Sequence, residues 1–159
     1  MTNLTFLHTP PYQFTAENDF GYQVFHYSYT PEKCICAMRW RGFFLAEEIQ
    51  AIFMEVARFN VEYKLKVVGV LNDMQRVEGS FHDSIEWFLT QFVPQKVVPN
   101  GIKFSANVKP KNFYASLSYD EFLEHFETPH YENRLFNTVE EATLWLETML
   151  ADQSKAKPV

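Results

Sequence analysis

The chain has 159 residues, of which 47% are hydrophobic and 21% charged, and these proportions are typical of one ordinary globular domain. They exclude a disordered, collagen-like or low-complexity chain for most of its length. With 14 Lys and Arg against 20 Asp and Glu, the net charge is −6, which is opposite in sign to the field that a phosphate backbone needs. We therefore expect no sequence-independent binding of nucleic acid.

No apolar run approaches the roughly 18 residues of a membrane span, and the first residues lack a basic start followed by an apolar stretch. We therefore expect a cytoplasmic protein without a transmembrane segment. Cys34 and Cys36 lie one residue apart in a strand-like run, where alternate side chains share a face at about 6.6 Å between Cα atoms. A disulfide between them would be strained, so we expect two reduced, half-buried thiols.

The aromatic content is the one compositional oddity. At 17% of the chain, with 16 Phe, 8 Tyr and 3 Trp, it supplies more large apolar surface than a core of this size readily hides. One interpretation is a Phe-rich core. The other is that a second subunit or an apolar ligand covers one aromatic surface.

The first half of the chain predicts an arm, a hairpin and a helix. Residues 1–20 hold two adjacent prolines and no steady periodicity, so they predict an irregular arm. The runs 22–29 and 34–40 are rich in β-favouring residues and flank a turn, which predicts an antiparallel hairpin. From Phe44 the apolar residues take helical spacing, which predicts a helix packed on a sheet.

The middle of the chain predicts a central strand and a second helix. Residues 65–71 are a short, nearly continuous apolar run, typical of a strand buried on both faces, and Asn72 and Asp73 close it. Ser80 is a natural N-cap for the following helix. Pro94, Pro99 and Gly101 are expected to stop that helix.

The last third predicts two strands and two helices. Residues 102–108 and 131–136 have the composition of strands. Capping-box patterns at 118–121 and 138–141 each predict the start of a helix. The tail, 152–159, is polar without apolar periodicity, and we expect it to be disordered.

The element order is therefore β-β-α-β-α-β-α-β-α. This order predicts an α/β fold with a mixed, mainly parallel sheet of about five strands, covered by helices through right-handed crossovers. Residues 21–151 are expected to form a single domain.

Catalytic signatures are scarce. The five glycines are scattered singly, so neither a P-loop nor a G-x-G-x-x-G turn can be written, and a G-x-S-x-G elbow is also missing. His82 and Glu86, four residues apart on one helix, could hold a metal or run acid and base chemistry together with Asp73. Carboxylates at helix starts also simply favour the helix dipole. We adopt that interpretation and expect no catalytic residue, metal or cofactor.

Ser80 has the other notable position. It lies where a loop from the expected central strand becomes a helix N-terminus, and a phosphate there would meet free backbone N–H groups and a favourable dipole. An ordinary N-cap is the alternative interpretation.

The whole pattern resembles a family. The residues 38–42 and 44–48 contain a W-x-G-x-x-x-x-E-E run, similar to the start of bacterial SpoIIAA-like or STAS-like domains, sometimes labelled STAS/SEC14. Further similarity lies in the central strand at 67–73, the loop at 108–113 and the closing turn and helix at 136–146. The resemblance implies this fold for about residues 22 to 150.

The resemblance also implies functions. In anti-sigma-factor antagonists of this fold, a serine at the start of the helix after the central strand is phosphorylated and switches a protein contact. Ser80 matches that serine by position and Ser84 by its preceding Asp, although the D-S-S-G pattern is replaced here by Glu78-Gly79-Ser80-Phe81. The second half of the label implies a lipid pocket.

Two functions from different classes follow. The first is a non-enzymatic interaction module that contacts a protein partner or forms a homodimer through Phe25, Tyr27 and Tyr29. The second is a protein that binds an apolar ligand or lipid in a pocket between helix and sheet. The candidate pocket residues are aromatic: Phe81, Trp87, Phe88 and Phe92, or residues near Phe113 and Tyr114.

Overall fold

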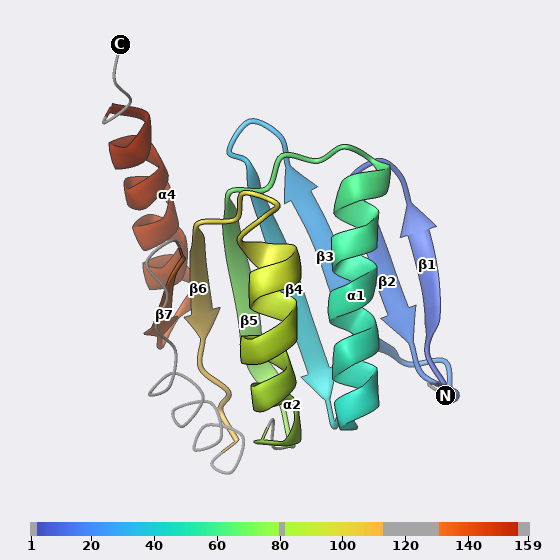
Figure 1. The fold of residues 1–159 in the computed structure, drawn as a ribbon. Coiled ribbons are helices and arrows are strands. Elements are labelled where there is room, and N and C mark those ends of the chain that lie inside the picture. The colour runs from blue at the N-terminus through green and yellow to red at the C-terminus, as the bar shows by residue number, and fades with distance from the viewer. Residues whose placement is uncertain (1–2, 80–81, 113–130, 156–159) are drawn as a thin grey trace.

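Seven strands lie side by side in one sheet in the computed structural model, which describes residues 3–79, 82–112 and 131–155 (Figure 1). Their order in the sheet is their order in the chain. The strands are β1 (Thr5–Thr9), β2 (Gln13–Glu17), β3 (Gln23–Thr30), β4 (Ile35–Gly42), β5 (Gly69–Val77), β6 (Phe104–Val108) and β7 (Glu132–Phe136). The described helices are α1 (Ala46–Glu62), α2 (His82–Trp87), the π-helix η1 (Phe88–Val97) and α4 (Val139–Lys155).

The sheet is mixed. Its first four strands are antiparallel neighbours, and β4 to β7 are parallel neighbours. The expected α/β class and the hairpin of β3 and β4 are confirmed. The expected count of about five strands and the mainly parallel balance are wrong, because an N-terminal hairpin adds two antiparallel strands.

That N-terminal hairpin replaces the irregular arm that we expected over residues 1–20. Phe14 and Ala16 of β2 are fully buried, and their alternation is the signal of a half-buried strand. The two strands have five residues each and are joined across two prolines. In so short a segment, an alternation of apolar and polar residues cannot be distinguished from chance. The hairpin is also tied to α1, where the His8 imidazole lies 3.1 Å from the buried Glu55 carboxylate.

The central strand is present but shifted toward the C-terminus. It begins at Gly69 and continues through Asn72 and Asp73, which were expected to close it. Met74 and Val77 continue its buried positions. The prediction failed because Asn72 is itself buried, with hydrogen bonds to side chains of both neighbouring strands, so a polar residue does not mark the end of this strand.

The ends of two helices differ in how well they follow the prediction. The helix after β5 passes through Pro94 and ends at Val97, before Pro99 and Gly101, the other two residues expected to stop it. Its second half is π-helical and its hydrogen bonds reach back five residues, as from Val98 N–H to the Val93 carbonyl at 3.0 Å. The last helix begins as its capping box predicts, with Glu141 N–H bonded to Thr138 Oγ1 at 3.1 Å. It continues to Lys155, so the first part of the expected disordered tail is helical. Ser80, Phe81 and the helix expected at 118–121 lie outside the described residues.

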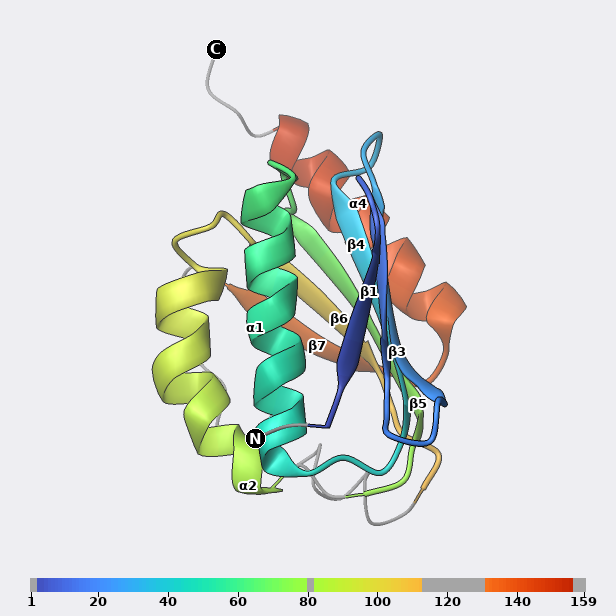
Figure 2. The ribbon, with the colours of Figure 1, turned by 90° about the vertical axis from the view of Figure 1, so that its right-hand side faces the viewer.

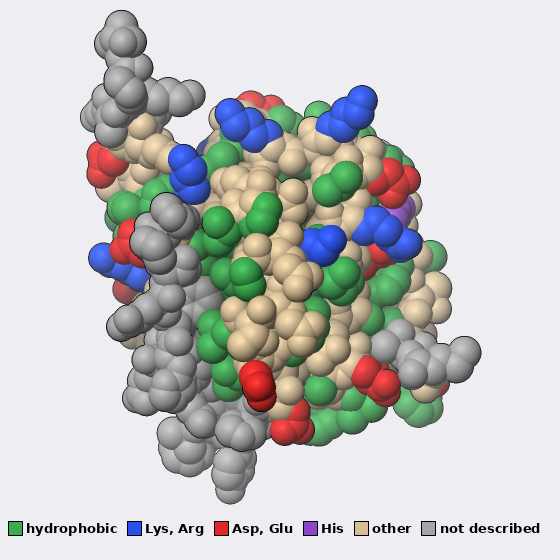
Figure 3. All heavy atoms as spheres, viewed as in Figure 1, with side chains coloured by type: hydrophobic (Ala, Val, Ile, Leu, Met, Phe, Trp, Pro, Cys, Tyr) green, Lys and Arg blue, Asp and Glu red, His purple; other side chains and the backbone are tan. Residues whose placement is uncertain are grey.

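The helices form layers on both faces of the sheet. In Figure 2, α1 and the α2–η1 segment cover one face, and α4 packs on the other, against β5, β6 and β7. The largest buried side chains, including Phe14, Phe25, Trp40 and Phe59, lie between α1 and the sheet. In Figure 3, separate hydrophobic side chains lie among polar side chains and backbone over α1 and η1, and Lys and Arg side chains lie mainly in the upper half of this face.

The N-terminal hairpin makes a testable contribution to stability. We expect Phe14→Ala to lower the free energy of unfolding by about 3 to 5 kcal/mol, because it deletes a fully buried ring that stacks on Tyr27 at 5.1 Å. Leu7→Ala in β1, whose side chain is 46% exposed, should change it by no more than about 0.5 kcal/mol. Urea denaturation measures both values, and equal small effects would show that the hairpin is not part of the core.

Candidate functional site

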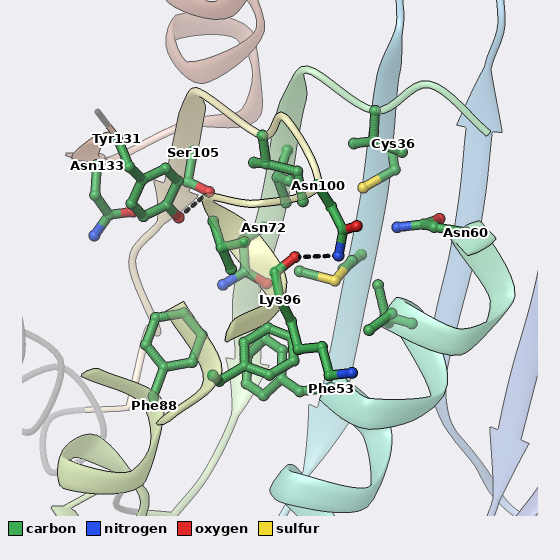
Figure 4. Close-up of a pocket in the computed structure, with 18 of the residues that line it drawn as sticks. Cys36, Phe53, Asn60, Asn72, Phe88, Lys96, Asn100, Ser105, Tyr131 and Asn133 are labelled. Carbon is green, nitrogen blue, oxygen red and sulfur yellow. Dashed lines mark hydrogen bonds between the residues drawn. The ribbon is translucent and has the colours of Figure 1, made fainter. Parts of the chain in front are cut away.

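A cavity of about 300 Å³ lies between the sheet and the helices α1 and η1 (Figure 4). Phe53 of α1 contacts Phe88 and Phe92 of η1, with ring centroids 5.0 Å apart in each pair. These contacts join the two helices beside the cavity, and Phe53 also packs on Trp40 of β4, with ring centroids 5.2 Å apart. Apolar side chains supply most of the remaining lining: Cys36, Met38, Ile49, Val56, Ala57, Val70, Met74, Ile85, Val97 and Ile102.

A ladder of buried amides crosses the sheet at the base of this cavity. The Trp40 indole N–H donates to Asn72 Oδ1 at 2.6 Å, and Asn72 Nδ2 donates to Asn107 Oδ1 at 3.0 Å. Asn107 Nδ2 in turn donates to Asn133 Oδ1 at 2.6 Å. An indole N–H can only donate, so Trp40 determines the orientation of Asn72 and, through it, of the amides that follow.

Two buried polar atoms at the cavity have no hydrogen-bond partner in the described part of the chain. They are the hydroxyl oxygen of Ser84 and Nδ2 of Asn133, and both residues line the cavity. Ser84 is only 4% exposed. Buried polar atoms almost always have a partner, so an unpaired one beside a cavity points to water or a bound molecule there.

The polar groups at the base are neutral. Tyr131 donates a hydrogen bond to Ser105, and burial raises the pKa of its phenol well above its usual range. Burial also raises the pKa of the Cys36 thiol to about 12. Among the described residues that line the cavity there is no Asp or Glu, so the described lining offers no carboxylate for acid and base chemistry.

The structure separates the residues that were predicted for a pocket. Phe88 and Phe92 line the cavity, as a pocket between helix and sheet requires. Trp87 does not line it and packs on Phe92 at 5.4 Å beside a neighbouring groove. Phe81, Phe113 and Tyr114 lie outside the described residues.

The residues predicted for a dimer contact and for phosphorylation are placed differently from what we expected. Phe25, Tyr27 and Tyr29 are 1%, 0% and 9% exposed, because their side chains face α1, so they offer no surface to a second copy. The Ser84 hydroxyl is buried at the cavity, out of reach of a kinase in the folded chain. Ser80, the other candidate, lies outside the described residues.

The acid and base group considered above is not assembled by described side chains. Asp73 lies in the interior of β5, where its carboxylate accepts the Gln75 N–H at 3.1 Å, and Glu86 is exposed on α2. No group of three or more His, Cys, Asp or Glu side chains that could hold a metal occurs within residues 3–79, 82–112 and 131–155. Over the same ranges, no helix has the length and apolar character needed to cross a bilayer.

Sequence reasoning missed most of the polar part of this site. A signal was present, because Asn72 and Asn107 occupy directly paired positions of adjacent strands. An Asn in a strand interior is unfavourable unless its amide is bonded, so two of them in predicted buried strands favour a side-chain network. The predicted strand boundary at Asn72 instead treats a polar residue as the end of a buried strand.

The comparisons with known proteins add no assignment. No protein-family model, no curated protein and no solved structure matches the chain. The resemblance to SpoIIAA-like and STAS-like domains therefore stays a prediction, and the cavity is the feature from which a function can be argued.

The amide ladder can be tested through stability. Asn72→Leu keeps the side-chain size but leaves the Trp40 N–H without its acceptor, so we expect the free energy of unfolding to fall by about 1 to 3 kcal/mol. Asn137→Leu, at an exposed asparagine outside the cavity lining, is the control and should change it by no more than about 0.5 kcal/mol. Urea denaturation would contradict the ladder if the two variants were equally stable.

The two thiols differ more than we expected. Cys34 precedes β4 in a turn at φ 56°, half-buried, whereas Cys36 is fully buried in the strand. Because burial keeps Cys36 protonated below about pH 12, we expect a thiol reagent at pH 8 to modify only Cys34 in the native chain and both after unfolding. Cys34→Ser should show no native reaction, and two fast thiols in the native wild type would contradict the placement of Cys36.

Proposed function

We propose that the protein binds a small, mainly apolar molecule in the cavity between α1, η1 and the sheet. The observation that supports this is the cavity itself, with its apolar lining and with Ser84 Oγ and Asn133 Nδ2 left unpaired beside it. Protein cores are close-packed, and voids larger than a water molecule are few. A space of about 300 Å³ is at the lower end of the volumes of ligand pockets.

The volume limits what can bind. A cavity of about 150 Å³ accommodates one benzene ring of six heavy atoms, so twice that volume suits about twelve non-hydrogen atoms. A bicyclic aromatic compound or a chain of ten to twelve atoms, on the order of this limit, would fit. A whole phospholipid is several times larger, so the lipid-sized ligand implied by the family label is not what we propose.

The interaction module is the weaker hypothesis for this chain. Its expected contact residues in β3, Phe25, Tyr27 and Tyr29, and its candidate switch at Ser84 are all buried. This leaves the hypothesis without an identified surface among the described residues, whereas the ligand hypothesis has a cavity of a definite size and lining.

Filling the cavity should abolish binding without damaging the fold. Ala57 of α1 lines the cavity, so Ala57→Leu should place its side chain in empty space and change the free energy of unfolding by less than about 1 kcal/mol. The same change at Ala106, which is fully buried against α4, should cost about 1 to 3 kcal/mol through overpacking. We expect Ala57→Leu to weaken binding of 2-isopropylnaphthalene at least about tenfold, because the larger side chain occupies space that the apolar probe would otherwise fill.

Ala51→Leu on the same helix is the matched control, because Ala51 does not line this cavity. Binding is followed by protein fluorescence, since Trp40 lines the cavity, and native mass spectrometry of protein from its own host detects a co-purifying molecule. Absence of binding to the wild type, or equal binding by wild type and Ala57→Leu, would overturn the proposal.

A further inference from the structure

We infer that the ligand carries one neutral group that both accepts and donates a hydrogen bond, as a carboxamide does, and that Asn60 and Asn100 bind it. This inference rests on the proposed function and specifies the ligand class as a small apolar carboxamide. It comes from three observations at one end of the cavity: the position of the two asparagines, the hydrogen bonds that orient them and the atoms that they leave for a ligand.

Asn60 and Asn100 reach the same end of the cavity from two separate segments. Asn60 belongs to the last turn of α1, and Asn100 lies in the turn that follows η1. Figure 1 shows the C-terminal ends of α1 and η1 on the same side of the molecule, and both asparagines line the cavity. In Figure 4 the Asn60 nitrogen and the Asn100 oxygen point toward one another. One bound group can therefore contact both amides.

A hydrogen bond from Tyr27 orients the Asn60 amide. The Tyr27 hydroxyl donates to Asn60 Oδ1, so the amide nitrogen is turned away from Tyr27 and toward the cavity (Figure 4). Tyr27 is fully buried in the aromatic core under α1, which holds its hydroxyl in place. Asn60 therefore presents a hydrogen-bond donor at this end.

A main-chain carbonyl orients the Asn100 amide. Asn100 Nδ2 donates to the Lys96 carbonyl at 2.7 Å, and because a carbonyl oxygen can only accept, the Asn100 oxygen must lie on the other side of the amide. The backbone is fixed as well, since the Ile102 N–H donates to the Val97 carbonyl at 3.2 Å and Gly101 supplies the φ of 85° that this turn needs. Asn100 therefore presents a hydrogen-bond acceptor.

The two atoms that face each other are not used by the rest of the fold. In the part of the chain that the structure describes, neither Asn60 Nδ2 nor Asn100 Oδ1 has a hydrogen bond to another protein atom. The amides at the base of the cavity, in contrast, bond to each other, as Asn72 does to Asn107. A polar group of the ligand is therefore matched by the end with Asn60 and Asn100, and its apolar body by the apolar lining.

This pair of atoms favours a group with one acceptor and one donor. A ketone accepts from Asn60 but brings no proton to Asn100 Oδ1, and a carboxylate places a negative oxygen against it. An alkylammonium group only donates, so it has no acceptor for the Asn60 N–H. A carboxamide satisfies both residues, because its oxygen accepts from Asn60 and its nitrogen donates to Asn100.

A purely structural role is the alternative for both residues. Asn100 satisfies a carbonyl at the end of η1, and Asn60 supplies the acceptor that the buried Tyr27 hydroxyl needs. These roles use only Asn100 Nδ2 and Asn60 Oδ1. Variants that change the opposite atom of each amide therefore separate the structural role from a contact with the ligand.

The test compares three probes matched in size, 2-naphthamide, 2-acetylnaphthalene and 2-isopropylnaphthalene, titrated at pH 7 with wild type and variants. Their substituents accept and donate, accept only, or do neither. We expect Asn100→Leu to weaken binding of 2-naphthamide about tenfold and to leave the other two affinities within about twofold, because only the carboxamide loses an acceptor. Asn100→Asp loses the same bond to the Lys96 carbonyl but keeps an acceptor, so it should bind 2-naphthamide within about threefold of the wild type.

Asn60→Asp tests the donor. A carboxylate accepts the Tyr27 hydroxyl as the amide oxygen does, but it cannot donate. We therefore expect binding of 2-acetylnaphthalene to weaken about tenfold, and binding of 2-isopropylnaphthalene to stay within about twofold. Asn137→Leu, at an exposed asparagine outside the cavity lining, should bind all three probes as the wild type does.

The outcomes separate this inference from the proposed function. If the wild type binds 2-isopropylnaphthalene but not 2-naphthamide, or if Asn100→Leu or Asn60→Asp fails to weaken its polar probe selectively, the carboxamide inference is overturned and the proposed function stands. Equal losses of 2-naphthamide binding in Asn100→Leu and Asn100→Asp would overturn the inference in the same way, because Asn100 would then act only through the end of η1. Absence of 2-isopropylnaphthalene binding to the wild type would overturn the proposed function itself.

Discussion

The buried indole of Trp40 is the constraint from which much of this structure follows. An indole N–H in a core must have an acceptor, and here it is the amide of Asn72 in the adjacent strand. The amide nitrogen of Asn72 needs an acceptor in turn, which is the amide oxygen of Asn107, and the amide nitrogen of Asn107 donates to Asn133. Four neighbouring strands thus share one chain of hydrogen bonds inside the core.

This chain of amides divides the face under α1 and η1 into two parts. Beside β2 and β3, the face is aromatic and fully packed, with Phe14, Tyr27 and Phe59 in mutual contact. Beside β5, β6 and β7 this face presents amides and hydroxyls. Apolar helix side chains that pack on such polar groups stabilise the fold little. The cavity lies at this polar part, and the contacts of Phe53 with η1 complete its apolar side.

Much of the local structure was predictable because its signal is local. The periodicity after Phe44 defined α1, the β-rich runs around the turn at 30–33 defined the β3–β4 hairpin, and Thr138 with Glu141 defined the start of α4. The failures were non-local. The first two strands are stabilised by pairing with β3 and by burial under α1, and neither contact leaves a long periodic pattern in residues 1–20.

For the candidate site, the amino-acid sequence determined the aromatic helix stripe with Phe88 and Phe92, the excess of acidic residues and the absence of nucleotide-binding glycine loops. The tertiary structure decided that Phe25, Tyr27 and Tyr29 face inward, that Ser84 lies at a cavity, and that three asparagines from separate strands form one ladder. The physical reason is that periodicity specifies which side chains share a face of their own element. Only packing decides which element covers that face, and whether the space beneath it is filled.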